Sequence, residues 1–351
     1  MNRLHRIGGR FSQRLYVIVL SAVAVLLAGC NSGGGGTPTA SAPPASSAVT
    51  YTSVGGAGEL LTYTLDTSSL KYSYKITHSS YGLAGVSGSG TLTANTNGTY
   101  TPKGMPNVRI VPAQNGLLIG AVRLAINGTQ KIVPLIGVQH PLTSFAAIAG
   151  TYNYVGGGCA SSSRTSCSVA YGTVHLDSNG TWASCFEADY TAGSNCSGSP
   201  KNTGTLNSLG NGEWQVLLSS GVEVGTGIGF QSPNGQKVWV LDLSQPAAKG
   251  GLGVGIDVGS TRVSSNQTIA QGTWIFAGTT ASSGYAGSLT VSGANYSGTM
   301  FGGNSYGPYS LSFNDPWAGF ATSTNGAVTL LAGTGVYAAD DGNSIEIGLR
   351  Q

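Results

Sequence analysis

Short stretches of alternating apolar and polar residues, separated by turn residues, constrain the fold of this chain more than any other feature. After Thr50, turn residues recur every 8 to 12 positions, and the stretches 63–66, 71–76 and 237–243 are rich in β-branched and aromatic residues. A period of two with frequent turns predicts antiparallel strands. No long helical pattern competes with this period. Only residues 140–150, HPLTSFAAIAG, predict a short helix or connector.

The chain also repeats itself. Turn dipeptides occur at Asn127-Gly128, Asn234-Gly235 and Asp341-Gly342, so positions 127, 234 and 341 are separated by equal intervals of 107 residues. Asn-Gly and Asp-Gly favour the positive φ that two-residue hairpin turns require. Each repeat also holds an earlier predicted hairpin, and two repeats open alike; these stretches are 91–101, 174–184 and 289–299 for the hairpins, and 148–155 and 269–277 for the openings. We therefore predict three related β units.

The fold class that follows is all-β, with antiparallel meanders in the three units 51–139, 145–245 and 266–351. A meander of six to eight strands closes as a small barrel or packs as a sandwich, and either arrangement protects the strand edges. A β-propeller of four-stranded blades is the alternative. The Gly-rich openings GTY and GTW resemble those of calycin-type barrels, and the pairing of a glycine tether with barrels resembles lipidated surface proteins of the transferrin-receptor type.

The first 29 residues have the three parts of a bacterial signal peptide. Arg3, Arg6, Arg10 and Arg14 form a positive start without an acidic residue, and residues 15–29 are apolar apart from Ser21. That run has the length of a signal-peptide core and is short for a membrane-spanning helix.

Leu27-Ala28-Gly29-Cys30 resembles the lipobox of bacterial lipoproteins. The resemblance implies that the Cys30 sulfur is acylated, that the leader 1–29 is removed, and that Cys30 becomes the first residue of the mature chain. Residues 30–50 then form a flexible, uncharged Gly/Ser/Pro tether. Because Asn31 rather than aspartate follows the cysteine, the expected location is the outer membrane. The expected partner is the lipid bilayer.

Composition excludes some partners. The formal charge is +3, but the leader holds four of the sixteen Lys and Arg residues and none of the thirteen acidic ones. The mature chain is therefore close to neutral, without the clustered bases of a nucleic-acid-binding protein. No cofactor motif is present.

Four cysteines follow the tether, at Cys159, Cys167, Cys185 and Cys196. An even number in an exported chain predicts two disulfides. Three pairings exist; we favour Cys159–Cys167 and Cys185–Cys196, because each would close one Ser-rich loop. A zinc site is the alternative, but the spacing contains no C-x2-C pair.

Catalytic patterns are weak. His78, His140 and His175 are far apart in the sequence, and His175 alternates with apolar neighbours as an outward-facing strand residue would. The stretch Gly303–Gly307 matches G-x-S-x-G, but it is flanked by strand sequence on both sides, and no histidine follows Ser305. We therefore predict no enzyme.

The strongest candidate for a ligand surface lies between Cys185 and Cys196. Glu187 and Asp189 are two residues apart and would share one strand face, and Trp182 and Tyr190 could stack on a sugar. We predict a non-enzymatic binding or scaffold module, anchored in the cell envelope, with a protein or glycan ligand. The alternatives are a structural envelope protein without a ligand and a secreted-type hydrolase. A concave, clustered set of aromatic residues would favour binding.

Overall fold

A computed structural model describes residues 47–351, except 57, 114–115, 127, 160–166, 192–194, 197–200, 232–234, 244–245, 248–250, 253, 262–265, 281–283, 333–334 and 343. The predicted leader, Cys30 and most of the tether therefore lie outside the described residues. Residues 46–351 form one compact unit. In the described part of the chain, no helix has the length and apolar character needed to cross a bilayer.

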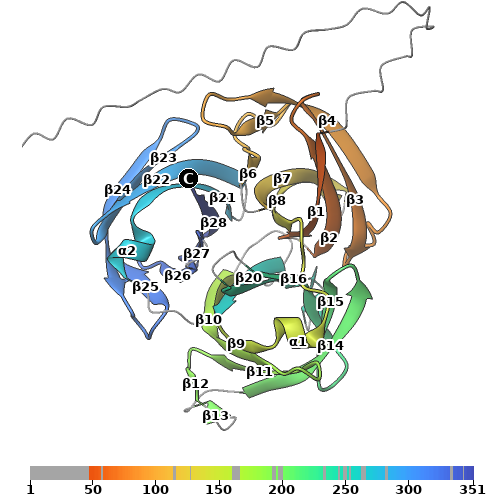
Figure 1. The fold of residues 1–351 in the computed structure, drawn as a ribbon, viewed down its shortest axis with the longest axis vertical. Coiled ribbons are helices and arrows are strands. Elements are labelled where there is room, and N and C mark those ends of the chain that lie inside the picture. Colours follow the sequence, from red (N-terminus) through yellow and green to blue (C-terminus); the bar gives the residue numbers. More distant parts are fainter. Residues whose placement is uncertain are drawn as a thin grey trace, which may run out of the picture. The chain divides into compact units, whose positions relative to one another are not determined.

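The first β unit is an eight-stranded antiparallel sheet in the order β5-β4-β3-β2-β1-β8-β7-β6. An isolated bridge between Tyr100 and Ile110 links its two ends, with backbone hydrogen bonds of 2.8 and 2.9 Å. The sheet is thus a nearly closed barrel (Figure 1), and its strands are β1 (Ala48–Gly55), β2 (Glu59–Asp66), β3 (Lys71–Ser79), β4 (Ser87–Ala94), β5 (Tyr100–Pro102), β6 (Val111–Pro112), β7 (Leu117–Ile126) and β8 (Thr129–Val138).

The second unit is a closed eight-stranded barrel, β9-β10-β11-β14-β15-β16-β17-β20, preceded by the short helix α1 (Phe145–Ile148). Two small hairpins, β12–β13 and β18–β19, lie outside its sheet. The strands are β9 (Gly150–Cys159), β10 (Cys167–Leu176), β11 (Thr181–Phe186), β12 (Tyr190–Thr191), β13 (Asn195–Cys196), β14 (Lys201–Gly210), β15 (Glu213–Leu218), β16 (Glu223–Gln231), β17 (Lys237–Leu243), β18 (Pro246–Ala247), β19 (Gly251–Leu252) and β20 (Val254–Thr261).

The third unit is a closed eight-stranded barrel in simple sequence order, preceded by α2 (Gln267–Ala270). Its first and last strands pair along their length and so leave no free edge. The strands, in blue in Figure 1, are β21 (Gly272–Thr280), β22 (Gly284–Ser292), β23 (Asn295–Met300), β24 (Ser305–Phe313), β25 (Phe320–Ser323), β26 (Val328–Ala332), β27 (Val336–Asp340) and β28 (Ser344–Arg350).

The structure confirms the all-β prediction and the barrel form of the units; the propeller alternative is not adopted, because each sheet has eight strands and curls on itself. The second unit extends beyond its predicted end at residue 245, which corrects that prediction. Its closing strand, β20, ends at Thr261 and pairs with both β17 and β9. The sequence hid this strand, because residues 249–255 are glycine-rich and do not look like a buried strand.

The two similar openings adopt the same local structure. Ser144 and Asn266 each cap a four-residue helix, and each side chain accepts a hydrogen bond from a backbone N–H three residues later. The first strand then carries a buried aromatic residue that donates back to the helix: the Tyr152 hydroxyl to Ile148 O at 2.5 Å, and the Trp274 indole N–H to Ala270 O at 2.9 Å. This shared device supports the predicted kinship of the second and third units.

Glycine and aromatic residues face one another across the strands in all three sheets. Directly opposed pairs include Tyr72 with Gly90, Phe276 with Gly287 and Tyr337 with Gly348. A Cβ atom at any of these glycines would collide with the opposite ring. The high glycine content therefore serves ring packing as well as turns.

The three barrels share one apolar core formed by their outer faces. Twenty buried residues make up this core, and no sheet supplies all of them; they are Val54, Leu60, Val111, Leu117, Ile119, Ile136 and Val138 from the first, Val155, Ile228, Phe230, Val238 and Val240 from the second, and Ile275, Phe320, Leu330, Val336, Ala338, Ile345, Ile347 and Leu349 from the third. Full burial of each such side chain stabilises the fold by roughly 1.5–3 kcal/mol. Each barrel also has a separate interior core.

Two carboxyl groups are buried where the first sheet meets the second barrel. Glu59 and Asp242 are both 0% exposed. Burial raises the pKa of both groups, and the proximity of Glu59 raises the pKa of Asp242 further, although the backbone N–H groups of Gly58 and Glu59 oppose the shift. Within the described residues, neither Glu59 carboxyl oxygen has a hydrogen-bond partner. The protonated forms are therefore favoured in the folded protein.

A second polar contact crosses the same junction. The Thr77 hydroxyl donates to Glu213 at 2.9 Å, and the His78 ring lies 3.3 Å from Glu223. The hydrogen bond to Glu223 raises the pKa of His78. A raised histidine pKa adds stability below its unfolded value, and this stability is lost as the pH rises through the folded value.

We predict that stability decreases from pH 5 to pH 8, because Glu59 and Asp242 are held protonated in the fold but ionise freely when unfolded. A carboxyl with a raised folded pKa stabilises fully below its unfolded pKa and progressively less above it. Glu59→Gln should remove part of this dependence and raise the free energy of unfolding at pH 8 by roughly 2 kcal/mol. Urea unfolding of both proteins at pH 5 and pH 8 measures the free energy of unfolding. Equal pH dependence in Glu59→Gln and wild type would contradict the prediction.

Candidate functional site

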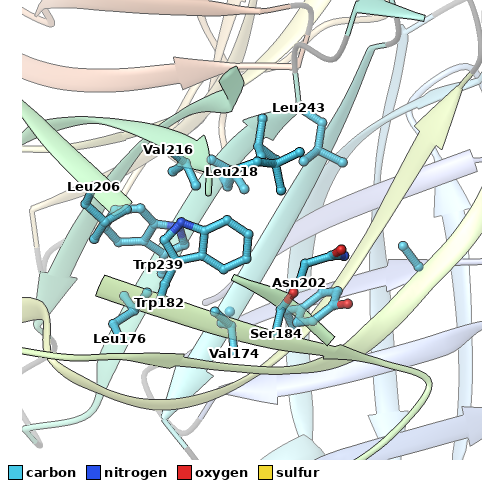
Figure 2. A pocket seen from close by; sticks show the side chains of 15 residues that line it. Val174, Leu176, Trp182, Ser184, Asn202, Leu206, Val216, Leu218, Trp239 and Leu243 are labelled. Carbon is cyan, nitrogen blue, oxygen red and sulfur yellow. The ribbon is translucent and has the colours of Figure 1, made fainter. Parts of the chain in front are cut away.

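The interior of the second barrel contains a cavity of about 190 Å³. All eight barrel strands contribute to its lining, and Figure 2 shows the labelled side chains around a common space. Its buried part is apolar, and consists of Leu176, Trp182, Leu206, Val216, Val224 and Trp239. A cavity of about 150 Å³ can hold benzene, so this one has room for a ligand of about that size or slightly larger.

Strand alternation decides which residues reach the cavity. Leu176 lies opposite Trp182 and Val174 opposite Ser184, and all four line the cavity. The residues between them on β10 and β11 therefore lie on the outer face.

Glycines make room for the indole rings. Gly204 lies directly opposite Trp182, and Gly229 directly opposite Trp239. A side chain at Gly204 would collide with both the Leu217 carbonyl and the Trp182 ring. The Trp182 indole N–H donates to Leu217 O at 3.1 Å, which satisfies its polar atom and orients its ring.

The short helix α1 covers one end of the barrel interior. The Phe145 ring lies 5.0 Å from the buried Trp214 ring, whose N–H donates to Leu142 O at 3.2 Å. Ile148 is also fully buried in this cluster. Trp214 pairs in register with Ser208 of β14, near the C-terminal end of that strand.

Polar groups lie toward the other end of β14. Asn202 and Ser184 are directly opposite one another across β14 and β11, and both line the cavity. Tyr154 also lines it and donates its hydroxyl to Cys185 O at 3.4 Å. Asn202 is exposed and Ser184 half-buried. The cavity therefore combines apolar walls with a polar rim.

The predicted ligand surface is divided by the barrel wall. Trp182 faces the interior and is 6% exposed, whereas Tyr190 stacks on the outward His175 at 5.2 Å. Glu187 is exposed, and Asp189 is half-buried between it and Tyr190. The four residues do not form one surface, which corrects the expectation; the physical reason is that Trp182 is on a barrel strand and points inward, whereas the other three follow the end of β11.

Cys185 and Cys196 form a disulfide, as predicted. It ties β11 to the small hairpin β12–β13 on the outside of the barrel. Cys159 and Cys167 lie opposite one another in the register of β9 and β10; their side chains lie outside the described part of the structure, so that pairing stays a prediction.

The other candidate groups are scattered. His175 contacts Thr151 and Asp177, and His78 contacts Glu223 where the first sheet meets the second barrel. Ser305 begins β24 after β23, so strands flank the G-x-S-x-G match as expected. Among the described residues, no group of three or more His, Cys, Asp or Glu side chains is arranged to hold a metal ion.

Sequence reasoning missed the cavity itself. The stretches 201–206 and 254–261 contribute Asn202, Leu206 and Gly259 to its lining, but their glycine and hydroxyl content looks like turn sequence. The available signal was the alternation of aromatic residues with glycines on successive strands.

Comparisons with known proteins leave the chain without a family. No protein-family model matches the sequence, and no curated protein matches it. Among solved structures, it is similar to a double mutant of the vaccine antigen Transferrin Binding Protein B from Haemophilus parasuis Hp5, at 9% identity and a TM-score of 0.25. The match covers 84% of this chain, which spans 65% of that one.

We predict that breaking the disulfide destabilises the second barrel without removing its fold. Closing a loop of this length stabilises a protein by roughly 2.5 kcal/mol, through the lower entropy of the unfolded chain. Cys185→Ser with Cys196→Ser should lower the free energy of unfolding in urea by about that amount. Unchanged stability in the double variant would contradict the prediction.

Proposed function

We propose that this protein is a lipid-anchored binding protein of the cell envelope, and that its second barrel binds a small ligand with an apolar body and a polar end. The observation that carries the proposal is the cavity of about 190 Å³ inside that barrel, lined by Trp182, Trp239 and aliphatic side chains. Eight-stranded barrels of this kind can hold one small ligand.

The lining indicates the class of ligand. The buried lining is apolar apart from indole nitrogens, and the N–H of Trp182 already has a partner, because it donates to Leu217 O. That region therefore favours aliphatic or aromatic carbon. Asn202 and Ser184 supply hydrogen-bonding groups toward the rim, which suits a hydroxyl, amide or carboxyl at one end of the ligand.

The proposed role is binding rather than catalysis. The polar groups at the rim are an amide and two hydroxyls, and no nucleophile–base pair accompanies them in the described lining. The structural alternative requires a barrel interior filled by its own side chains, whereas the second barrel encloses a cavity of about 190 Å³.

The lipid anchor is the second part of the proposal, and it rests on the lipobox-like Leu27-Ala28-Gly29-Cys30. Two or more acyl chains hold a protein stably on a bilayer. The tether between Cys30 and β1, which begins at Ala48, would span roughly 20–25 Å root-mean-square and separate the barrels from the membrane surface.

We predict that phenol binds the compact unit 46–351 and that Val174→Phe weakens binding at least tenfold, because the larger side chain occupies the cavity. Thr205→Phe is the matched control, since Thr205 is exposed and is absent from the lining. Fluorescence titration measures the affinity, and near-ultraviolet circular dichroism verifies folding. Equal affinity in both variants, or no binding by wild type, would contradict the proposed site.

We also predict that the mature protein lacks residues 1–29 and carries acyl chains on Cys30, so that it fractionates with membranes. Cys30→Ala should be neither acylated nor cleaved at that position. Intact mass and membrane fractionation test both points. An unmodified Cys30 behind an intact leader would refute the anchor but leave the barrel cavity untouched.

A further inference from the structure

The third barrel holds a carboxyl group in its interior. Glu346 lies on β28 between Ile345 and Ile347, and both isoleucines belong to the shared outer core. Strand alternation therefore directs Glu346 inward, where it lines the small cavity of that barrel.

Tyrosine hydroxyls surround this carboxyl group. Tyr285 donates to one oxygen at 3.0 Å and Tyr337 to the other at 3.3 Å. The hydroxyl of Tyr306 is buried and, within the described residues, has no hydrogen-bond partner, although Tyr306 lies close enough for the charge of Glu346 to affect its pKa. The interior thus holds a buried carboxyl group that accepts hydrogen bonds from two tyrosine hydroxyls.

Aromatic rings form the walls of this interior. Trp274 packs edge-on against Tyr337, with ring centroids 5.5 Å apart. The Phe276 ring packs edge-on against the rings of Tyr285 and Tyr306, with centroid distances of 6.1 Å in both pairs. Ring faces attract cations, most strongly where water is excluded.

The charge on Glu346 is uncompensated within the described chain. Burial raises the pKa of Glu346 to about 7, against the opposing effect of the two tyrosine hydrogen bonds. The other charged group that acts on it is Asp341, which has the same sign. Burial also raises the pKa of Tyr285, Tyr306 and Tyr337, so these hydroxyls stay neutral.

The cavity beside Glu346 measures about 40 Å³ and is lined by Trp274, Tyr296, Tyr337 and aliphatic side chains. The cavity of about 150 Å³ that can hold benzene is nearly four times larger, so there is room here for a ligand of one or two heavy atoms.

We propose that the third barrel binds a small primary ammonium ion, with Glu346 as its counter-ion and the rings of Trp274, Tyr296 and Tyr337 around its alkyl group. An anion would be repelled by Glu346, and a purely apolar ligand would leave the carboxyl group without a new partner. A divalent metal ion requires several oxygen ligands, whereas one carboxylate lines this cavity. The site is independent of the one proposed in the second barrel.

The test is calorimetric titration of methylammonium into the full chain in a non-ionic detergent at pH 8, with methanol as the neutral probe of the same size. We expect the ammonium ion to bind and the alcohol to bind at least tenfold more weakly. Glu346→Gln keeps the size of the side chain and should abolish ammonium binding. Glu213→Gln, on the outer face of the second barrel, is the matched control and should bind like wild type.

Two further measurements distinguish a specific binding site from a general effect of charge. Affinity should decrease about tenfold per pH unit below 7, because the protonated carboxyl group no longer attracts the cation. Val174→Phe should have no effect, which distinguishes this site from the cavity of the second barrel.

Three outcomes would overturn the proposal. They are absence of ammonium binding by folded wild type at millimolar concentration, equal affinity of wild type and Glu346→Gln, and equal affinity for the ammonium ion and the alcohol. Circular dichroism of each variant confirms that the barrels remain folded. If Glu346→Gln unfolds, the pH profile and the comparison of the ammonium ion with the alcohol decide the question.

Discussion

Burial of the strands on both faces is the constraint on which the rest of this structure depends. Each sheet closes around its own interior and also contributes its outer face to a core shared by all three. Val155, Ile228 and Ile275 are buried although they point out of their own barrels. The barrels therefore stabilise one another, and the packing of one depends on the outer surface of its neighbours.

This arrangement also buries ionisable and polar groups. Glu59 and Asp242 are both fully buried where the first sheet meets the second barrel. Asn153, fully buried on β9, is satisfied instead by the third barrel: it donates to Ala318 O at 2.7 Å and accepts from the Trp317 indole at 3.2 Å. Polar contacts thus fix the orientation of the outer faces, while apolar contacts supply most of the stability.

The second and third barrels share a construction and differ in content. Both open with a capped helical turn and an aromatic residue that donates back to it, and both fit their rings against glycines. The second encloses a larger, apolar cavity with a polar rim, whereas the third encloses a carboxyl group among tyrosines. One scaffold therefore offers two chemically different interiors, which is the basis for proposing two different ligands.

The sequence by itself determined the all-β class, since turn chemistry and alternation are local properties. It also indicated three repeated units and a short helix or connector before the second, and it favoured Cys185–Cys196 among the possible disulfides. Positive φ angles at Gly128, Gly235 and Gly342 confirm the turns inferred from the repeated dipeptides. Only the tertiary structure decided which face of each strand points inward. In 344–350, the alternation of isoleucine and glutamate looks like a strand with its acid in water; the shared core takes both isoleucines, so Glu346 faces the barrel interior. Alternation in a sequence distinguishes two faces of a strand, but it does not tell which face meets solvent when both are covered.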